Sequence, residues 1–383
     1  MSSTVTTSDV VIDRGAVAPE GKEVMTEFPV VGVHGRQRYE IHCGDARDVV
    51  PTLPEVHCVV TSPPYLGQRV YGHSESEIGR GEDVEGYIAE LCDLFDAIPL
   101  HQRGSLWVNM GDKRRGGALL GIPARFEVAM IDRGWHFLDD PTWAKGVVHV
   151  DGTTRGGFLP EPAWRRLNGN AHEKVWRFAR TTEAWSDVCA VNIPRRGVEG
   201  TRYLPPELMS CETALEGRRC PNVWQVPMGQ TSEDHHAAYP KALCERPIAM
   251  TAPVWINPDG SLPARIVASL GYDEARGPNR VIGKRTDEDG RKRSGRNDTG
   301  RPYTPRKPMT TGWMPGFDPE GEPSIVLDPL MGTGTTGEVA LKLGRSFIGI
   351  DLYPSYCEMA RHGCEETLRF LQERNLDPLA LIR

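Results

Sequence analysis

Apolar and polar positions alternate in blocks along the chain, and each block has the period of a strand or a helix. Short apolar runs closed by glycine, proline or acidic residues predict strands, at 38–43, 56–60, 105–110, 134–138 and 172–180. Apolar residues at helical spacing predict helices, over about 84–98, 122–132 and 356–372. Because strands and helices alternate, the pattern predicts an α/β fold with a mainly parallel sheet.

One stretch near the C-terminal end, Ser324–Leu352, has the pattern of a strand, a turn, a helix and a second strand. Gly332 and Gly334 stand in the turn, where the chain must bend sharply or let a ligand approach its backbone. Asp351 closes the second strand, at the place where such folds set a carboxylate against ribose hydroxyls. The pattern is GTG rather than GxGxxG. It therefore predicts either a nucleotide-like cofactor site or a βαβ turn without a ligand.

A second pattern, Thr61–Tyr65 (TSPPY), follows the strand predicted at 56–60. Consecutive prolines cannot continue a central strand, so this segment is predicted to be a loop at the strand's end. Ser62 Oγ and the Pro63 carbonyl are candidate acceptors for the hydrogens of an exocyclic amine, Pro64 helps to stiffen the backbone, and Tyr65 offers a face for a base. The alternative is a proline-stiffened loop with a buried tyrosine.

Composition limits the classes of protein. At 383 residues, with 39% hydrophobic and 25% charged residues, the chain has the composition of one large or two ordinary globular domains. No apolar run approaches the roughly 20 residues of a membrane span, and the N-terminus lacks the pattern of a signal peptide, so we expect no membrane association and a cytoplasmic location. The nine cysteines form no CxxC pair. We therefore expect free thiols and no metal site.

Charge is unevenly distributed. The net charge is −7, but residues 276–307 contain eleven Lys or Arg against four acidic residues. This run is either a polyanion-binding surface or a solvated loop. Its DNA-binding candidates are Arg291, Lys292, Arg293 and Arg296. The surrounding segment 253–322 is too long for a plain connector and is interpreted as an inserted DNA-contacting element or a segment that a partner orders.

TSPPY at 61–65 and DPLMGTGTT at 328–336 together resemble the SAM-dependent DNA amino-methyltransferases, in the β-class order in which the SPPY block comes first. The resemblance covers about 38–252 and 323–375. It implies a circularly permuted Rossmann-like methyltransferase core, with the strand of Asp45 beside that of Asp351 and the cofactor at the carboxyl ends of the strands.

The resemblance also implies residue roles. Ser62, Pro63, Pro64 and Tyr65 would be the catalytic residues. Binding of S-adenosyl-L-methionine (SAM) would fall to Asp45, His236, Asp328, Pro329, Gly332, Thr333, Gly334, Thr335 and Asp351. Leu330 stands where the family usually has Phe. The domains follow: a flexible tail at 1–36, a discontinuous methyltransferase domain at 37–252 and 323–375, a target-recognition segment within it at 195–221, and a basic insertion at 253–322.

The function implied is site-specific methylation of the N4 amine of a flipped cytosine in double-stranded DNA, because SPPY usually accompanies that activity in the family. The alternatives are N6-adenine methylation, an amine methyltransferase for RNA, protein or a small molecule, and a non-catalytic SAM- and DNA-binding regulator. C5-cytosine methylation is disfavoured because it needs a nucleophilic cysteine, and the chain has no Pro-Cys dipeptide. A cognate restriction endonuclease and a second copy of the chain are further partners that we consider.

Two other groups of residues have simpler interpretations. His235 and His236 are interpreted as loop histidines rather than a metal pair, because no third ligand has suitable spacing. The acidic residues Glu77, Glu82, Asp83 and Glu85 are interpreted as a solvated approach to the helix at 84–98.

Overall fold

The computed structural model describes residues 29–67, 77–81, 83–148, 154–155, 172–187, 190–191, 220–227, 239–263, 265–268, 309–313 and 321–374. Contacts divide the chain into a first unit (Met1–Ile193, Arg219–Pro263, Asp318–Arg383) and a second unit (Pro194–Arg218, Ala264–Phe317). In the second unit, the described part is an antiparallel pair, β14 (Arg265–Ala268) and β15 (Met309–Trp313).

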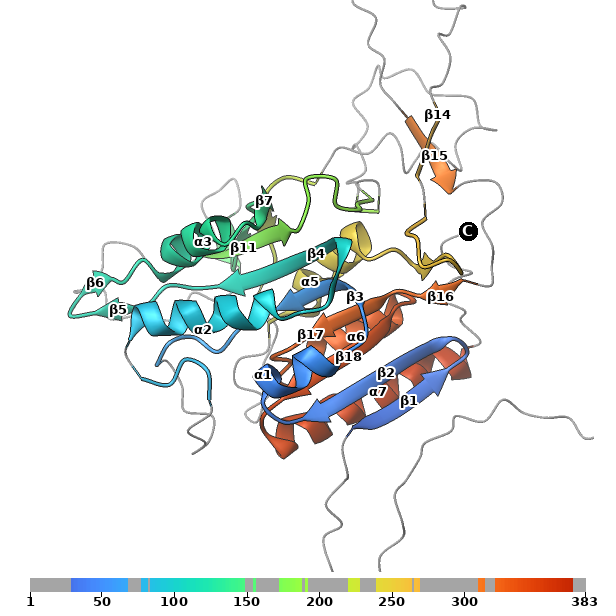
Figure 1. Cartoon of the computed structure of the whole chain (residues 1–383), viewed down its shortest axis with the longest axis horizontal. Coiled ribbons are helices and arrows are strands. Elements are labelled where there is room, and N and C mark those ends of the chain that lie inside the picture. Colours follow the sequence, from blue (N-terminus) through green and yellow to red (C-terminus); the bar gives the residue numbers. More distant parts are fainter. Residues whose placement is uncertain are drawn as a thin grey trace, which may run out of the picture. The chain divides into compact units, whose positions relative to one another are not determined.

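The first unit is built on a ten-stranded sheet with the order β1-β2-β18-β17-β3-β4-β11-β8-β12, in which β7 also pairs with β11 (Figure 1). These strands are β1 (Val30–His34), β2 (Gln37–Cys43), β18 (Ser346–Asp351), β17 (Ile325–Asp328), β3 (Val56–Thr61), β4 (Leu100–Met110), β11 (His172–Ala179), β8 (Thr142–Ala144), β12 (Val223–Gln225) and β7 (His136–Asp139). Pairing is parallel from β2 to β4, whereas β1 and β11 are antiparallel to their neighbours. The predicted α/β class with a mainly parallel sheet is therefore confirmed.

The strand order is permuted relative to the sequence. The last two strands of the sheet, β17 and β18, lie between β2 and β3, which are among the first. In the register of β18 with β2, Asp351 lies opposite Cys43, and the Gly44 N–H donates to the Asp351 carbonyl at 2.9 Å. The prediction that the strand leading to Asp45 lies beside the strand of Asp351 is confirmed.

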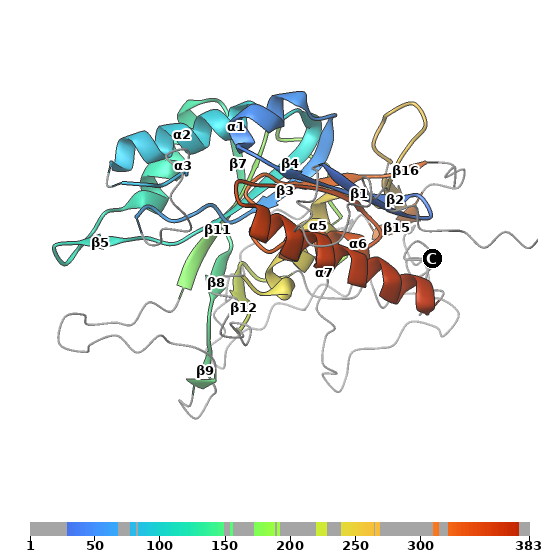
Figure 2. The ribbon, with the colours of Figure 1, turned by 90° about the horizontal axis from the view of Figure 1, so that it is seen from below.

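Helices cover both faces of the sheet (Figure 2). One face carries α1 (Ala46–Val49), α2 (Val84–Asp96) and α3 (Ile122–Asp132), and the other carries α5 (Lys241–Thr251), α6 (Thr335–Lys342) and α7 (Pro354–Glu373). Side chains alternate between the two faces along each strand. In β4, Leu106 and Val108 pack with α2 and α3, whereas Trp107 packs into the opposite core. Since both faces are covered, β3 is buried along its whole length and β17 and β18 along most of theirs.

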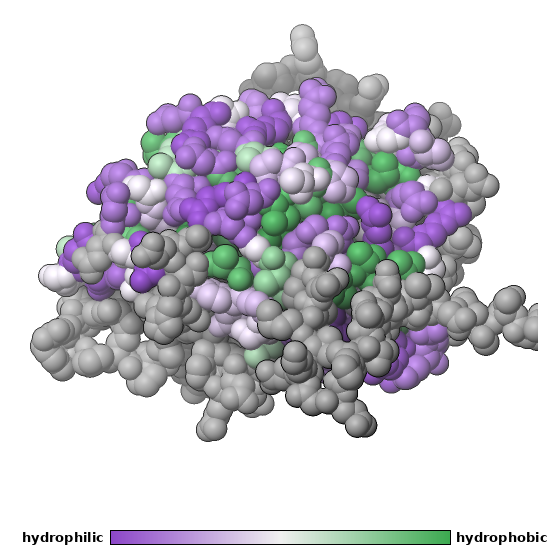
Figure 3. Space-filling view, turned by 60° about the horizontal axis from the view of Figure 1, so that its bottom comes forward, coloured by the Kyte–Doolittle hydropathy of each residue, from purple (hydrophilic) through white to green (hydrophobic). Residues whose placement is uncertain are grey.

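Several short elements complete the described part. They are the 3-10 helix η1 (Val50–Thr52) and the antiparallel pairs β5 (Arg114–Arg115) with β6 (Ala118–Leu119), β9 (Val147–Val148) with β10 (Thr154–Arg155), and β13 (Trp255–Ile256) with β16 (Glu322–Pro323). No described helix is long and apolar enough to cross a membrane. Among the coloured residues of Figure 3, hydrophilic side chains surround smaller hydrophobic areas.

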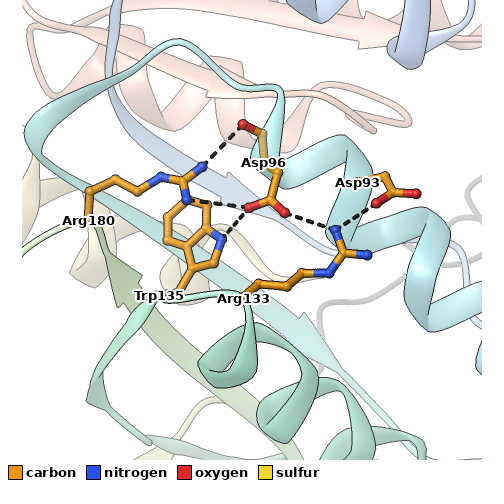
Figure 4. A network of polar contacts seen from close by, with 5 residues as sticks. All are labelled: Asp93, Asp96, Arg133, Trp135 and Arg180. Atoms are coloured by element: carbon orange, nitrogen blue, oxygen red, sulfur yellow. Dashed lines mark hydrogen bonds and ion pairs between the residues drawn. The ribbon is translucent and has the colours of Figure 1, made fainter.

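A polar network joins the end of α2 to α3 and β11 (Figure 4). The Asp96 carboxylate accepts hydrogen bonds from Arg133 at 2.9 Å, Trp135 Nε1 at 2.8 Å and Arg180 at 3.3 Å. Arg133 also donates to Asp93 at 2.6 Å, and the Arg180 guanidinium lies 3.7 Å from the centre of the Trp135 ring. Burial raises the pKa of Asp96, but the bonds from Arg133 and Trp135 outweigh it and hold that pKa below its usual value.

Some predicted boundaries need correction. The flexible tail at 1–36 was wrong at its end, because β1 pairs with β2 and alternates buried and exposed residues as an edge strand does; residues 1–28 lie outside the described part. The insertion at 253–322 was too wide, because Val254, Trp255 and Ile256 are buried and β13 pairs with β16 within the first unit. The target-recognition segment at 195–221 stays a prediction; of it, the structure describes residues 220–221.

Candidate active site

The TSPPY loop follows β3. The turn that contains Gly332 and Gly334, which we call the glycine turn, follows the neighbouring strand β17. β3 and β17 are parallel partners, with Cys58 opposite Val326 and Val59 opposite Leu327. Beyond this pairing, the Thr336 hydroxyl oxygen at the start of α6 lies 3.4 Å from the Val60 carbonyl oxygen. Because parallel strands end at the same edge, two patterns that lie more than 250 residues apart in the sequence meet at the carboxyl edge of the sheet.

The glycine turn has one open side and one closed side. Gly332 and Gly334 have φ values of 55° and 85°, which favour glycine. A Cβ on Gly334 would lie 2.6 Å from the Ala360 Cβ, so α7 already occupies the space on this side of the turn. A Cβ on Gly332 would have no atom within 4 Å. The Gly332 side of the turn therefore leaves room for a ligand to approach the backbone.

Asp351 lies beside this open side at the end of β18. Its carboxylate accepts hydrogen bonds from the Gly332 N–H at 3.0 Å and the Tyr353 N–H at 2.9 Å. Burial nevertheless raises the pKa of Asp351 to about 7. A carboxylate has about four acceptor sites, so Asp351 retains capacity to accept hydrogen bonds from ligand hydroxyls. Tyr353 in turn donates its hydroxyl to Glu77 at 3.2 Å. Glu77 is only 8% exposed, so its interpretation as a solvated residue was wrong.

Asp328 ends β17, directly before the glycine turn. It is fully buried and accepts hydrogen bonds from the Thr336 hydroxyl at 2.6 Å, the Leu330 N–H at 3.2 Å and the Tyr239 hydroxyl at 3.3 Å. Burial raises its pKa to about 6. These bonds tie the turn to the start of α6. The place of Asp328 in the SAM cradle stays a prediction.

The remaining residues of the turn differ in access. Pro329 is buried behind Asp328, and Thr335 is 8% exposed in the first turn of α6. Thr333 is half-buried beside Gly332. Leu330, which departs from the family pattern, is half-buried and packs against the core under α2.

Asp45 caps the N-terminus of α1 at the end of β2. Its carboxylate accepts hydrogen bonds from the Arg47 N–H and Nε, both at 2.9 Å, and Arg47 also pairs with Glu90 on α2. The hydrogen bonds from Arg47 hold the pKa of Asp45 below its usual value. Asp45 is therefore an ionised carboxylate fixed by its own helix, next to the strand that carries Asp351.

The TSPPY loop is attached to its surroundings at several points. The Ser62 hydroxyl donates to Asn109 Oδ1 on β4 at 3.4 Å, a long contact. The Asn109 amide donates to the Lys174 carbonyl at 3.0 Å, which fixes its orientation. The Tyr87 hydroxyl on α2 donates to the Pro64 carbonyl at 2.8 Å. Since partners on β4 and α2 hold this loop, its backbone has little freedom.

Tyr65 is held by a buried ion pair that the sequence did not reveal. Its hydroxyl donates to Glu173 Oε2 at 2.6 Å, and the Lys145 ammonium donates to the other oxygen of the same carboxylate. Lys145 and Glu173 are only 9% and 6% exposed. Gly111 lies against the ring, because a Cβ there would be 3.1 Å from Tyr65 Cε2. Burial raises the pKa of Tyr65, so the ring is a neutral phenol in a fixed orientation.

Other predicted residues cannot be placed. His236, with its neighbour His235, and the basic candidates Arg291, Lys292, Arg293 and Arg296 lie outside the described residues. Their roles stay predictions. Lys145 and Glu173, by contrast, stand in two sequence blocks, PTWAK and NAHEKVWRFAR, whose polar members were given no role.

Comparison with known proteins adds a family match. The family described as DNA methylase (N6_N4_Mtase) matches residues 56–254 and 320–362. The type II methyltransferase M.Cfr9I of Citrobacter freundii is 32% identical over 83% of this chain and 84% of its own length. M.SmaI of Serratia marcescens is 23% identical over 84% of this chain and 89% of its own length. A solved PvuII DNA methyltransferase (cytosine-N4-specific) is 18% identical, with a TM-score of 0.49 over 89% of this chain and 93% of that one.

Proposed function

Since this chain belongs to the DNA methylase family, we propose that it transfers a methyl group from SAM to the exocyclic N4 amine of a cytosine flipped out of duplex DNA. The observation that carries the proposal is the parallel pairing of β3 with β17. This pairing sets the TSPPY loop and the open side of the glycine turn at neighbouring points of one edge, as a reaction between a bound cofactor and a bound base requires.

The open side of the turn fits the proposed cofactor. Gly332 and Thr333 would line the methionine part, where the turn leaves room above its backbone. Asp351 would accept hydrogen bonds from the ribose hydroxyls, and Asp45 lies near the expected position of the adenine amine. When bound, SAM supplies an electrophilic methyl group. Asp328 would act indirectly, by holding the turn through Thr336.

The TSPPY loop fits an exocyclic amine. While the Ser62 hydroxyl donates to Asn109, its lone pairs can accept an amino hydrogen and so favour positive charge on the attacking nitrogen. The ring of Tyr65, fixed by Glu173, offers a face for the base. When the nitrogen takes the methyl group, the bond from that carbon to the sulfur of SAM breaks with its electron pair on sulfur, and the nitrogen gives one proton to water. Ser62 favours cytosine; N6-adenine methylation shares every other feature and is the alternative.

The wider role is also a proposal. The relatives are named type II methyltransferases, which supports a place in a restriction–modification system with a cognate endonuclease. The basic run at 276–307 supports a second contact to DNA phosphates through Arg291, Lys292, Arg293 and Arg296.

The proposed function is tested by methyl transfer from labelled SAM to unmethylated duplex DNA, followed by digestion and mass spectrometry. We expect N4-methylcytosine, and loss of the product with Ser62→Ala. N6-methyladenine would overturn the assignment of the base. Label found only in RNA or protein would overturn the substrate class.

A further inference from the structure

A small hairpin follows β4 at the carboxyl edge of the sheet (Figure 1). It consists of β5 (Arg114–Arg115) and β6 (Ala118–Leu119), and we call residues 114–119 the arm. Gly116 and Gly117 form its turn with φ values of 59° and 89°, the two positive values of a tight hairpin turn. All six residues of the arm are exposed. No core therefore explains why the chain builds it.

The arm has a firm base. The Asp112 carboxylate accepts hydrogen bonds from the N–H groups of Lys113 at 2.8 Å, Gly121 at 3.1 Å and Ile122 at 3.1 Å. The Leu120 N–H also donates to the Lys113 carbonyl at 2.9 Å. One acidic residue thus joins the end of β4, both ends of the arm and the start of α3. The direction of the arm is fixed at this base.

The base of the arm touches the TSPPY loop region. The Lys113 ammonium donates to the Gly67 carbonyl at 3.0 Å, two residues beyond Tyr65. Gly111, on the other side of Asp112, lies against the Tyr65 ring. The arm therefore begins three residues after Gly111, which lies against the ring that is proposed to face the base. With two residues on each strand, at about 3.4 Å each, its turn lies roughly 7 Å beyond the base.

The chemistry of the arm is that of a polyanion contact. Lys113, Arg114 and Arg115 are three consecutive basic residues in a chain whose net charge is −7. Asp112, the acidic residue next to them in the sequence, accepts hydrogen bonds from three backbone N–H groups, and the Arg114 guanidinium donates to the Gly117 carbonyl at 2.8 Å. Arg114 is paired with Leu119, so a guanidinium and a 56% exposed apolar side chain lie on the same face of the ribbon. A two-stranded ribbon is narrow enough for the major groove.

We propose that the arm contacts the phosphate backbone of the duplex beside the flipped base, and so positions the DNA over the TSPPY loop. This inference rests on the proposed function, because it takes duplex DNA as the substrate. Arg114 and Arg115 supply affinity and register and carry no sequence information.

The test compares the double variant Arg114→Gln/Arg115→Gln with Arg369→Gln/Arg374→Gln in the full chain. Both variants remove two exposed positive charges. Arg369 and Arg374 lie at the C-terminal end of α7, a helix of 20 residues that starts at the carboxyl edge and leads away from it. A third variant, Leu119→Ser, changes the arm without changing its charge.

The measurement is the dissociation constant for a duplex at several salt concentrations, with SAM affinity and methylation at saturating DNA beside it. In the arm variant we expect weaker DNA binding, a salt slope reduced by about 2, and unchanged SAM affinity. The α7 variant and Leu119→Ser keep the original slope. If the original protein methylates DNA and the arm variant keeps the full slope, the arm inference is wrong and the proposed function stands. If the original protein neither binds nor methylates DNA, both proposals fail.

Discussion

Replacing Gly332 by alanine tests the proposed cofactor site with a single methyl group. At φ 55°, an L-residue in this left-handed region costs about 1–2 kcal/mol. The smaller entropy of the unfolded chain offsets about 0.4–1 kcal/mol of this. No atom lies within 4 Å of the new Cβ, so no packing cost is added. We therefore expect Gly332→Ala to lower the free energy of unfolding by about 1 kcal/mol.

Two other glycines separate strain from occlusion of the ligand. Gly116 has φ 59° and equally open surroundings, but it lies in the arm, so Gly116→Ala carries the same strain without blocking the turn. Gly334 has φ 85° and a closed side, with the Ala360 Cβ only 2.6 Å from a new Cβ. Gly334→Ala should therefore lower the free energy of unfolding by roughly a further 1–3 kcal/mol through overpacking.

The assay combines urea unfolding with calorimetric titration of SAM. Gly332→Ala and Gly116→Ala should unfold at similar urea concentrations, whereas Gly332→Ala alone should bind SAM at least about tenfold more weakly, which is about 1.4 kcal/mol. The reasoning is refuted if Gly332→Ala binds SAM as well as Gly116→Ala does, because the added methyl group would then not lie in the cofactor's space.

Three further predictions concern other parts of the molecule. Glu173→Gln removes the negative charge that holds Tyr65 and Lys145. Methyl transfer at saturating substrates should therefore slow, while SAM affinity, measured by calorimetry, stays the same. An equal loss of rate and SAM affinity would contradict this role. SAM affinity should rise with pH through about 7, where Asp351 ionises and becomes a better acceptor, and this rise should vanish in Asp351→Asn. The raised pKa of Asp351 also affects stability. Between the usual pKa of an aspartate and pH 7 or so, the folded state binds more protons than the unfolded state. The free energy that Asp351 contributes to folding, measured by urea unfolding, should therefore fall as pH rises through this window. Asp96→Asn should lower the free energy of unfolding by about 1–3 kcal/mol and leave SAM affinity unchanged, since Asp96 lies in a network of α2, α3 and β11.

The sequence predicted the helices and strands whose own apolar residues recur with a clear helix or strand period. The predicted helix at 122–132 agrees with α3, and the strand at 172–180 agrees with β11 to one residue. Other elements depend on tertiary contacts. β1 is an edge strand in which only alternate residues are buried, and α5 contains Pro247 inside a helix that packs against the sheet and α6. Neither has a distinctive pattern of its own, because neighbouring elements hold it in place.

The same division applies to the candidate site. Ser62, Tyr65 and Asp351 stand in short motifs at strand ends, so local sequence was enough to find them. The Lys145–Glu173 pair depends on β8 pairing with β11, a contact between separate elements that no local spacing indicates. The inward orientation of Asp328 likewise depends on Tyr239, which is 89 residues away in the sequence.

Core residues of β3 and β17 set the position of the TSPPY loop relative to the glycine turn. Val326 lies opposite Cys58 and both pack on the α5 side, whereas Leu327 lies opposite Val59 and both pack on the α2 side. A slip of one residue would place each side chain on the wrong face, and a slip of two would move the glycine turn about 7 Å along the TSPPY loop. Displacements of about 1 Å already slow such reactions strongly. The alternation of core side chains in β3 and β17 therefore fixes more than the fold. It holds the proposed methyl donor and acceptor in register, although the sequence separates their binding loops by most of its length.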